Sequence, residues 1–439
     1  MRDVSQSLSV DQLLAERADG EPIRVGMVGA GAAGRAIALQ LVASVPGIRL
    51  VAIANRTVAN ARRAFAEAGS PPVVEVSSSE QLDREIARGR CVVTADAAVL
   101  SESRMLPVIV EVTGTVEYAA RVVSGALDQR KHVVLVNAEL DATVGPVLAR
   151  RAAERGVVLT NTDGDEPGVA MTLVRYLRSI GLRPVAAGNL KGLIDHYRTP
   201  ETQRAFAERF GQNPQKAASF ADATKLSLEA TILANATGFR VGRRGMYGPA
   251  CDDVQQIATR LPADEMLAGG LVDYALGAAP HTGAFVVVHE PDAGKRRLLT
   301  YGKMGDGPFY VFYTPFHLPH LQIASTIARA VLLRDPTVCP IDGPVCETVA
   351  IAKRDLHAGE QLDGVGGFCT YGLVDNAETA GAANALPIGV AEGCRVVRDI
   401  ARDQPISYAD VELPGDRLID ELRREQQLAP VSSLPAREL

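Results

Sequence analysis

Cysteine is scarce in this sequence, and none of it is arranged as a metal-binding pair. Only six cysteines occur in 439 residues, and no two of them form a C-x-x-C pair. This spacing argues against a zinc site, which usually draws on closely spaced thiolates. We therefore predict that the cysteines are small buried hydrophobic residues in a reducing compartment.

Long apolar runs are also absent. No window offers the roughly 18 uninterrupted apolar residues that a membrane-spanning helix needs. The first 21 residues carry seven charged side chains and lack the basic-then-apolar order of a secretory signal. We expect a soluble, cytoplasmic protein with no membrane partner. Val4, Leu8, Val10, Leu13 and Leu14 predict a short amphipathic helix ahead of the first strand.

The sequence has no excess of basic charge. Its formal net charge is −6, so it lacks the global positive field that nucleic-acid binding uses. With 47% hydrophobic and 22% charged residues, the composition is that of an ordinary globular protein. A length of 439 residues exceeds what one hydrophobic core usually serves, which predicts two or three domains.

The strongest local signal is a glycine turn between a strand and a helix. Residues 23–28 form a short apolar run, and helical spacing continues over residues 35–45. This context makes G-x-G-x-x-G a dinucleotide-binding turn, although such turns also occur as structural features of other α/β folds. The glycines permit a tight turn, close approach to a pyrophosphate and close packing, and the helix supplies N–H donors. The predicted cofactor contacts are Gly29, Gly31, Ala32, Ala33 and Gly34.

The second strand, residues 48–54, predicts which cofactor is preferred. NAD-binding domains usually end this strand with an acid that binds the ribose 2′-hydroxyl. Here the sequence reads Asn55-Arg56-Thr57. A guanidinium and a hydroxyl suit a 2′-phosphate, so we predict NADPH over NAD, with these three residues as contacts. Arg56 as a solvated loop residue is the alternative.

Further strands are predicted at residues 108–112, 131–136 and 157–160, which gives a doubly wound parallel sheet. Ligands bind at the carboxyl ends of the strands in such sheets. We therefore predict that Thr113, Gly114, Asn137 and Glu139 line the nicotinamide end of the site. The predicted fold is α/β, with a Rossmann domain over residues 1–165.

The rest of the chain is predicted to form two further domains and a tail. Residues 187–192 predict a strand end that presents Lys191, residues 224–236 predict a helix, and residues 304–317 predict an aromatic β-hairpin that a symmetric dimer could bury. We predict an α+β catalytic and dimerisation domain over residues 166–338, whose last apolar helix returns to the Rossmann domain. Short β elements then predict a small β-clip domain over residues 339–425 and a tail over 426–439.

These segments resemble known families. Val110–Gly114 and Arg130–Val133 resemble the homoserine dehydrogenase superfamily, and residues 345–413 resemble the SAF domain. Gly164–Pro167, Ala234–Gly238, Gly245–Pro249 and Lys303–Pro308 add to the likeness. The combination resembles the reductoisomerase-like (DRL) branch, best known for 1-deoxy-D-xylulose 5-phosphate reductoisomerase activity.

The resemblance implies a function in isoprenoid precursor synthesis. It implies an NADPH-dependent homodimeric enzyme acting on CH–OH groups, with a phosphorylated hydroxyketone as substrate and Mg²⁺ or Mn²⁺ as a further cofactor. Such chemistry needs carboxylates and a proton donor. Glu166, Glu229 and Lys191 are the catalytic candidates, with Asp165 and Glu166 as metal ligands. Lys191 is expected to have a pKa lowered by partial burial.

Other interpretations of these residues stay open. Glu166 could mark a turn before Pro167, Glu229 could be a surface helix residue, and Lys191 could be solvated. A simple NAD(P)-dependent dehydrogenase of a polyhydroxylated or homoserine-like substrate is the second hypothesis for the function. A non-catalytic, cofactor-binding regulatory protein is the third.

Overall fold

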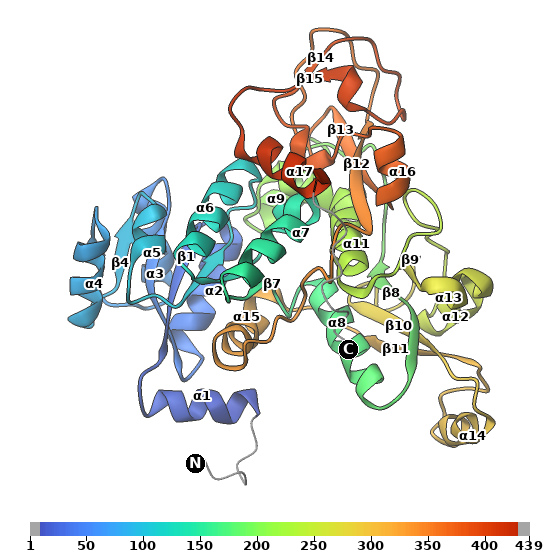
Figure 1. Cartoon of the computed structure of the whole chain (residues 1–439), viewed down its shortest axis with the longest axis horizontal. Helices are drawn as coiled ribbons and strands as arrows, with labels where there is room; N and C mark the ends of the chain where they lie inside the picture. The colour runs from blue at the N-terminus through green and yellow to red at the C-terminus, as the bar shows by residue number, and fades with distance from the viewer. Residues whose placement is uncertain (1–8, 429–439) are drawn as a thin grey trace. The chain divides into compact units, whose positions relative to one another are not determined.

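The computed structural model describes residues 9–428, and the chain divides into two compact units. Unit 1 comprises Met1–Asn137, Leu148–Gly164 and Leu318–Thr337, and unit 2 comprises Ala138–Val147, Asp165–His317 and Val338–Leu439. Figure 1 labels the elements along the chain. Val4 and Leu8 of the predicted N-terminal helix, and the predicted tail from residue 429 onward, lie outside the described residues.

The described part of unit 1 is built on a seven-stranded parallel sheet with the order β3-β4-β2-β1-β5-β6-β7. The strands are β1 (Ile23–Val28), β2 (Ile48–Ala54), β3 (Val74–Glu75), β4 (Val92–Thr94), β5 (Val108–Glu111), β6 (His132–Leu135) and β7 (Leu159–Asn161). Strand order reverses between β1 and β5. In open α/β sheets this reversal is the point at which ligands bind.

Helices cover this sheet because their apolar residues recur at helical spacing. Ile37 and Leu41 of α2, with Ile323 and Ile327 from the later part of the chain, share one core with Met27 of β1. The helices of unit 1 are α1 (Val10–Ala18), α2 (Ala32–Ala43), α3 (Val58–Glu67), α4 (Ser79–Ala87), α5 (Ala98–Glu102), α6 (Glu117–Asp128) and α15 (Pro319–Ala328), which continues into the π-helix η2 (Arg329–Leu333). The helix α7 (Ala138–Glu154) crosses the boundary between the units and is kinked at Val144, two residues before Pro146.

Unit 2 contains a mixed four-stranded sheet with the order β11-β10-β8-β9. The strands are β8 (Arg183–Lys191), β9 (Leu271–Leu276), β10 (Ala284–His289) and β11 (Phe309–Thr314), of which only β8 and β9 pair in parallel among the described residues. Its helices are α8 (Glu166–Ser179), α9 (Arg204–Arg209), α10 (Pro214–Ala221), α11 (Thr224–Thr237), α12 (Ile257–Arg260), α13 (Ala263–Gly269) and α14 (Ala293–Tyr301), with the 3-10 helix η1 at Val254–Gln256.

The C-terminal part of unit 2 is built from short β elements. The strands β12 (Cys346–Ala352) and β13 (Thr370–Asn376) pair antiparallel, as do β14 (Arg395–Val396) and β15 (Val411–Glu412). The helices are α16 (Ala377–Ala382) and α17 (Leu418–Leu428), and the 3-10 turns are η3 (Ile388–Val390) and η4 (Tyr408–Asp410). The predicted α/β fold class with a small C-terminal β domain is confirmed.

The first pair of these strands braces α11. The Thr224 hydroxyl at the start of α11 accepts a hydrogen bond from Gly372 N at 2.8 Å. The hydroxyls of Thr231 and Thr348 are 2.8 Å apart, and the Asn235 side-chain oxygen accepts hydrogen bonds from two backbone N–H groups ahead of and within β12. Since these groups are buried, the contacts fix α11 from one side.

Two local predictions were wrong. Residues 304–317 do not form a hairpin of their own, because β11 pairs with β10 and α14 lies between these two strands in the sequence. The predicted tail begins too early, because residues 426–428 complete α17, whose buried Leu422 ties it to the protein. None of the helices formed by residues 9–428 is long and apolar enough to cross a membrane.

Candidate functional site

The glycine turn of unit 1 leaves an open approach to the start of α2. Gly29 has a φ of +111°, and a Cβ added there would lie 2.9 Å from the Val112 carbonyl oxygen. A Cβ at Gly34 would lie 2.5 Å from the Gly29 oxygen, whereas one at Gly31 would meet nothing within 4 Å. Gly31 caps α2 without a side-chain hydrogen bond. The first N–H groups of a helix have no acceptor within it, and such groups, here those of Ala32 and Ala33, are the donors that commonly bind a phosphate.

The predicted ribose contacts follow β2. Asn55 accepts a hydrogen bond from Ala30 N at 3.1 Å and donates one to the Thr57 carbonyl at 2.8 Å. It thus joins the glycine turn to the next turn. Arg56 and Thr57 are exposed beside it. These positions leave a guanidinium and a hydroxyl accessible to a ligand at the end of β2.

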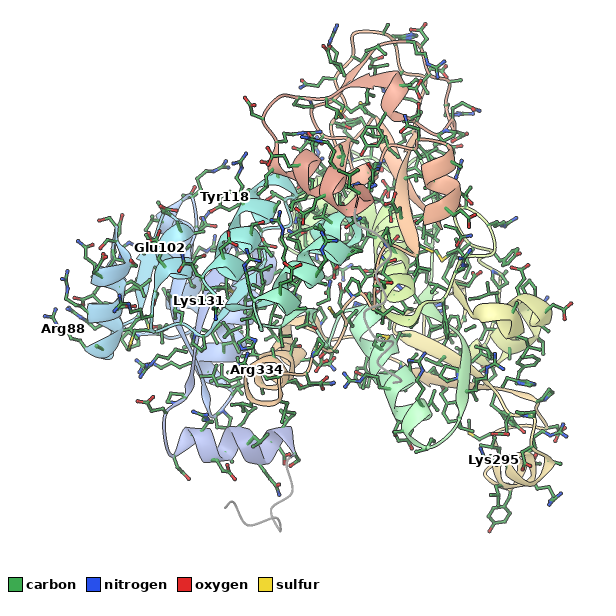
Figure 2. The ribbon with its side chains drawn as sticks, in the orientation of Figure 1. Arg88, Glu102, Tyr118, Lys131, Lys295 and Arg334 are labelled. Atoms are coloured by element: carbon green, nitrogen blue, oxygen red, sulfur yellow. The ribbon has the colours of Figure 1, made fainter. Side chains whose placement is uncertain are left out.

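The turn after β5 is held by a buried carboxylate. Glu111 accepts hydrogen bonds from the Thr113 N–H, at 2.8 Å, and from the Thr113 hydroxyl. Gly114 takes a φ of +64°, and Asn137 donates to the Thr115 carbonyl at 2.9 Å. The turn therefore joins the ends of β5 and β6, the strands on one side of the switch point. Tyr118, labelled in Figure 2, lies on the first turn of α6 beyond it.

Glu139 falls in a different unit from the other predicted nicotinamide contacts. It lies in the segment Ala138–Val147, which belongs to unit 2, whereas Thr113, Gly114 and Asn137 belong to unit 1. Within unit 2, Glu139 raises the pKa of Lys225 together with closer carboxylates, although burial acts on that pKa in the opposite direction.

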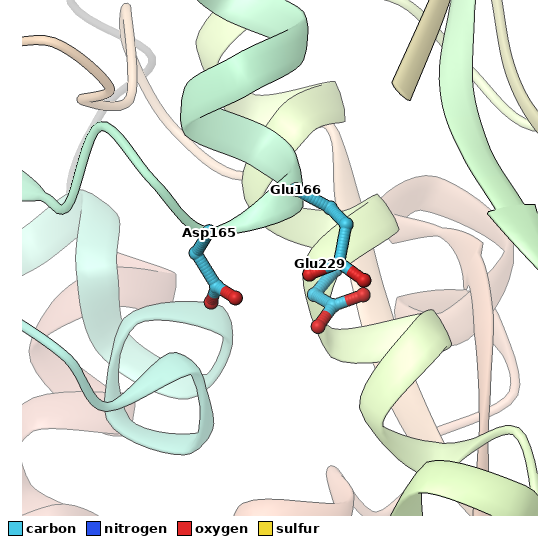
Figure 3. Close-up of side chains that lie close together, drawn as sticks. All are labelled: Asp165, Glu166 and Glu229. Atoms are coloured by element: carbon cyan, nitrogen blue, oxygen red, sulfur yellow. The ribbon is translucent and has the colours of Figure 1, made fainter. Parts of the chain in front are cut away.

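Unit 2 brings the predicted catalytic residues together. Asp165 caps α8, Glu166 begins it, Lys191 ends β8, and Glu229 lies midway along α11. Ligand oxygens of Asp165, Glu166 and Glu229 lie within 4.8 Å of one another. Figure 3 shows the carboxyl groups of Glu166 and Glu229 close together, with Asp165 approaching from the loop that precedes α8.

Two lysines sit among these three carboxylates. Lys191 Nζ is 2.9 Å from Glu166 Oε1 and 3.4 Å from Glu229 Oε2. Lys225 Nζ is 3.1 Å from Asp165 Oδ2 and 3.5 Å from Glu229 Oε1. Glu229 therefore shares its two oxygens between both ammonium groups. With every group ionised, this lysine–carboxylate cluster carries one negative charge in excess.

Lys225 and Asn189 were not predicted from the sequence as members of this site. Lys225 precedes Glu229 by four residues on the predicted helix, a spacing that places two side chains on one helix face. Asn189 precedes Lys191 by two residues on a strand, so both point to the same side of the sheet. Its amide donates to Glu229 Oε2 at 2.7 Å. Both spacings were available from the sequence once a helix and a strand had been predicted.

His317 and Tyr313 occupy different positions relative to the lysine–carboxylate cluster. His317 Nε2 lies 3.7 Å from Glu166 Oε2, and its Nδ1 lies 3.0 Å from the Thr282 hydroxyl. Tyr313 lies on the edge strand β11, opposite Phe285, and is exposed. His317 therefore adjoins the lysine–carboxylate cluster, whereas no contact among the described residues links Tyr313 to it.

The environment separates the proton affinities of the two glutamates. Burial raises the pKa of Glu229 to about 8, and Glu166 adds to the rise, while Lys191 and Lys225 oppose it. Burial acts on Glu166 in the same direction, but Lys191 and His317 outweigh it and hold the pKa of that carboxyl well below its usual range. Such opposed shifts are typical of paired acid–base groups.

The expected lowering of the Lys191 pKa is wrong. Burial does act to lower it, but Glu166 and Glu229 more than offset this effect, and the pKa lies above its usual value. Together the three carboxyl groups stabilise the ammonium form more than burial destabilises it. Lys191 is therefore a charged proton donor in this state.

The three carboxylates are the ligand type that a divalent cation prefers, but they are already paired with lysine side chains. Mg²⁺ and Mn²⁺ prefer carboxylate oxygens. However, one oxygen of Asp165, one of Glu166 and both of Glu229 are already within 3.5 Å of a lysine ammonium. A cation would have to displace at least one of these ammonium groups, so the site does not fit a resident metal as it stands.

Comparison with known families matches three consecutive segments. Residues 29–160 match the NAD-binding domain of homoserine dehydrogenase, residues 164–323 match the catalytic domain of oxidoreductase DRL, and residues 347–412 match the SAF domain. These matches confirm the resemblance that the sequence motifs indicated. The lysine–carboxylate cluster lies entirely within the segment that matches the DRL catalytic domain.

Two solved structures illustrate the level of structural likeness to this chain. GenD2 from gentamicin A biosynthesis, in complex with NAD, shares 14% identity with a TM-score of 0.38, over 72% of this chain and 88% of that one. The apo scyllo-inositol dehydrogenase from Lactobacillus casei shares 12% identity with a TM-score of 0.40, over 72% and 89%. No curated protein matches the chain significantly.

Proposed function

Because this chain is an NAD(P)-dependent oxidoreductase with a nicotinamide-binding domain and a small-molecule substrate, we propose that it is an NADPH-dependent reductoisomerase. Its substrate would be a phosphorylated hydroxyketone such as 1-deoxy-D-xylulose 5-phosphate. The observation that carries the proposal is the partly buried ammonium group of Lys191, which lies between Glu166 and Glu229, two carboxyl groups whose pKa values are shifted in opposite directions.

Lys191 is suited to the final proton transfer. Its raised pKa keeps it charged, so it can hydrogen-bond a substrate carbonyl oxygen and stabilise the negative charge that develops there. When bound, NADPH supplies the hydride. The resulting alkoxide takes a proton from Lys191, which is then replaced from solvent.

Glu229 is suited to the rearrangement. A pKa of about 8 lets it exchange a proton near neutral pH. In its ionised form, which is the minor form below pH 8, it would take a proton from the substrate hydroxyl when the carbon–carbon bond breaks, and return it to the alkoxide that forms when the new bond closes. The rearrangement then consumes no proton, and Glu166 stays ionised and holds Lys191 in place.

Cofactor preference belongs to the same proposal. Arg56 and Thr57, exposed at the end of β2, would bind the 2′-phosphate of NADPH. Asn55 would position both, since it bridges the glycine turn and the Thr57 carbonyl. The predicted contacts at the nicotinamide, Thr113, Gly114, Asn137 and Glu139, and the predicted domain boundaries also remain proposals.

The test is NADPH oxidation by the full-length chain with 1-deoxy-D-xylulose 5-phosphate, with and without Mg²⁺ or Mn²⁺, and with NADH in parallel. We expect a branched tetrol phosphate as product, and loss of turnover with retained NADPH binding in Lys191→Met. The matched control is Lys295→Met, because Lys295 lies on the outer helix α14 and is half exposed. Absence of product with intact cofactor binding would reject this substrate.

A specific observation favours a second candidate, a simple dehydrogenase of a polyhydroxylated substrate. The carboxylates that a metal-assisted rearrangement would use are already paired with Lys191 and Lys225. Turnover that reduces a carbonyl without a change of skeleton, and without response to chelators, would establish it. A metal requirement and a symmetric homodimer remain predictions that the same preparation tests.

A further inference from the structure

A cavity of about 270 Å³ lies in unit 2, and none of the lysine–carboxylate residues lines it. Its polar lining comes from His196, Ser227, Arg243, Arg244, Tyr247 and Tyr274. Apolar side chains from α11 and β13 complete the wall. A cavity of this size fits a small organic molecule rather than a cofactor.

Two adjacent guanidinium groups line the cavity. Arg243 lies over the Tyr247 ring, 5.3 Å from its centroid, and its Nε donates to the Met246 carbonyl at 2.9 Å. Arg244 Nε donates to the buried Asp375 at 2.7 Å. No hydrogen bond among the described residues uses Nη1 of Arg243, or Nη1 or Nη2 of Arg244. Each guanidinium group is thus held in place by some of its N–H groups, while its other N–H groups are available to a ligand.

Of the nearby acids, Asp375 neutralises Arg244, whereas no ion pair among the described residues joins an acid to Arg243. Asp375 is paired with Arg244, and Glu265 accepts the Tyr247 hydroxyl at 2.6 Å. Asp273 accepts three backbone N–H groups at 2.8–2.9 Å. Each of these carboxylates therefore already accepts hydrogen bonds from nearby protein donors.

A buried hydroxyl adds a second indication of a ligand. Ser227 is 1% exposed, and its Oγ has no hydrogen-bond partner within the part of the chain that the structure describes. Buried hydroxyls are normally hydrogen-bonded, because leaving one unpaired costs free energy. His196 is held by its Nδ1 at 3.0 Å from the Asp222 carbonyl and by stacking on Tyr371. Its Nε2 has no described partner.

We propose that this cavity is a second binding site, for a small organic oxyanion such as a phosphorylated or carboxylated metabolite. Arg243 and Arg244 bind the anionic group, and Ser227 supplies a hydroxyl contact to it. The aromatic walls from Tyr247 and Tyr274 accept the carbon body. Paired guanidinium groups bind planar or tetrahedral oxyanions through several charge-assisted hydrogen bonds.

The site is distinct from the lysine–carboxylate cluster but is connected to it through α11. Ser227 lies two residues from both Lys225 and Glu229, so it faces away from them around the helix. A ligand on Ser227 would stabilise the helix that positions those two groups. This inference does not depend on the reaction proposed for the cluster.

Titration calorimetry with inorganic phosphate, on full-length protein saturated with NADP⁺, tests the site. Saturation fills the proposed pyrophosphate site of unit 1, so the remaining binding comes from the cavity or from the reacting centre, and the variants distinguish the two. We expect Arg243→Gln to weaken phosphate binding at least tenfold, and Ser227→Ala to weaken it less. Arg240→Gln is the matched control, because Arg240 is 65% exposed, pairs with Glu378 and does not line the cavity.

Two results would overturn the proposal. Equal phosphate affinity in Arg243→Gln, Ser227→Ala and the unchanged protein would show that the cavity is not the site. Competition between phosphate and substrate in the NADPH assay would show that the anion occupies the reacting centre. If Arg243→Gln fails to fold, Arg243→Lys replaces it, because lysine keeps the charge but lacks the planar guanidinium group. Weaker phosphate binding by Arg243→Lys than by the unchanged protein then supports the site, and equal binding contradicts it.

Discussion

Glu229→Gln isolates the proton that the lysine–carboxylate cluster is expected to retain. Burial raises the pKa of Glu229 to about 8 from an ordinary value of 4.5. A group whose folded pKa is raised contributes stability that is complete below its unfolded pKa and is lost as pH rises through the folded pKa. A glutamine has nearly the shape of a protonated glutamate and cannot lose a proton.

The expected magnitude follows from these two pKa values. Between pH 6 and pH 8 the folded protein keeps most of this proton, whereas the unfolded chain has already released it. The linkage relation then gives a loss of about 2 kcal/mol in the free energy of unfolding of the unchanged protein across this interval. The variant should lack this loss, so its stability relative to the unchanged protein should increase by about that amount.

Chemical denaturation at pH 6, 7 and 8 measures the difference. The sequence has no tryptophan, so far-UV circular dichroism is the suitable signal. Glu378→Gln is the control, because Glu378 is an exposed carboxylate of the same unit. If the stability difference between Glu229→Gln and the unchanged protein stays constant within about 0.5 kcal/mol from pH 6 to 8, Glu229 is ionised throughout and the reasoning fails.

Three further substitutions test other parts of the structure. Arg56→Ala should lower the preference for NADPH over NADH at least tenfold in steady-state kinetics, since it removes a charge-assisted contact to the 2′-phosphate; an unchanged ratio would rule out that contact. Gly34→Ala should abolish NADPH binding measured by fluorescence, because its methyl group would lie 2.5 Å from the Gly29 oxygen. Lys353→Met should cost about 3–5 kcal/mol in thermal unfolding, because it leaves the buried Asp222 carboxylate, now 2.8 Å from the ammonium, without a cation. Adding Asp222→Asn should restore most of that loss, and failure to do so would contradict this account.

The sequence alone determined the central part of the nucleotide-binding half, although it did not predict the strands β3 and β4. The strand over residues 23–28 and the one over 48–54 were predicted to the residue, because an apolar run bounded by turn residues leaves little choice of ends. The glycines at 29, 31 and 34 also indicated the ligand class, because a dinucleotide-binding turn requires a residue without a side chain at each of these positions. These are local constraints, and local sequence contains them.

Sequence also predicted four of the five members of the lysine–carboxylate cluster, all but Lys225, but not their protonation. Glu166, Lys191 and Glu229 lie on three elements separated by up to 63 residues, and their chemistry was inferred from a family resemblance. Only tertiary packing could show that Glu229 is buried between two ammonium groups. The direction of the Lys191 pKa was predicted wrongly because burial was considered without the carboxylates that arrive from other elements.

The tertiary structure decided what no local pattern could express. It showed that α11 is buried along nearly its whole length, because the sheet of unit 2 covers one side and the strands of the C-terminal β domain brace the other. It also placed Ser227, Arg243 and Arg244 around one cavity, although the sequence showed only a small basic cluster. Burial and charge pairing depend on which segments meet in space, and distances along the chain do not specify those meetings.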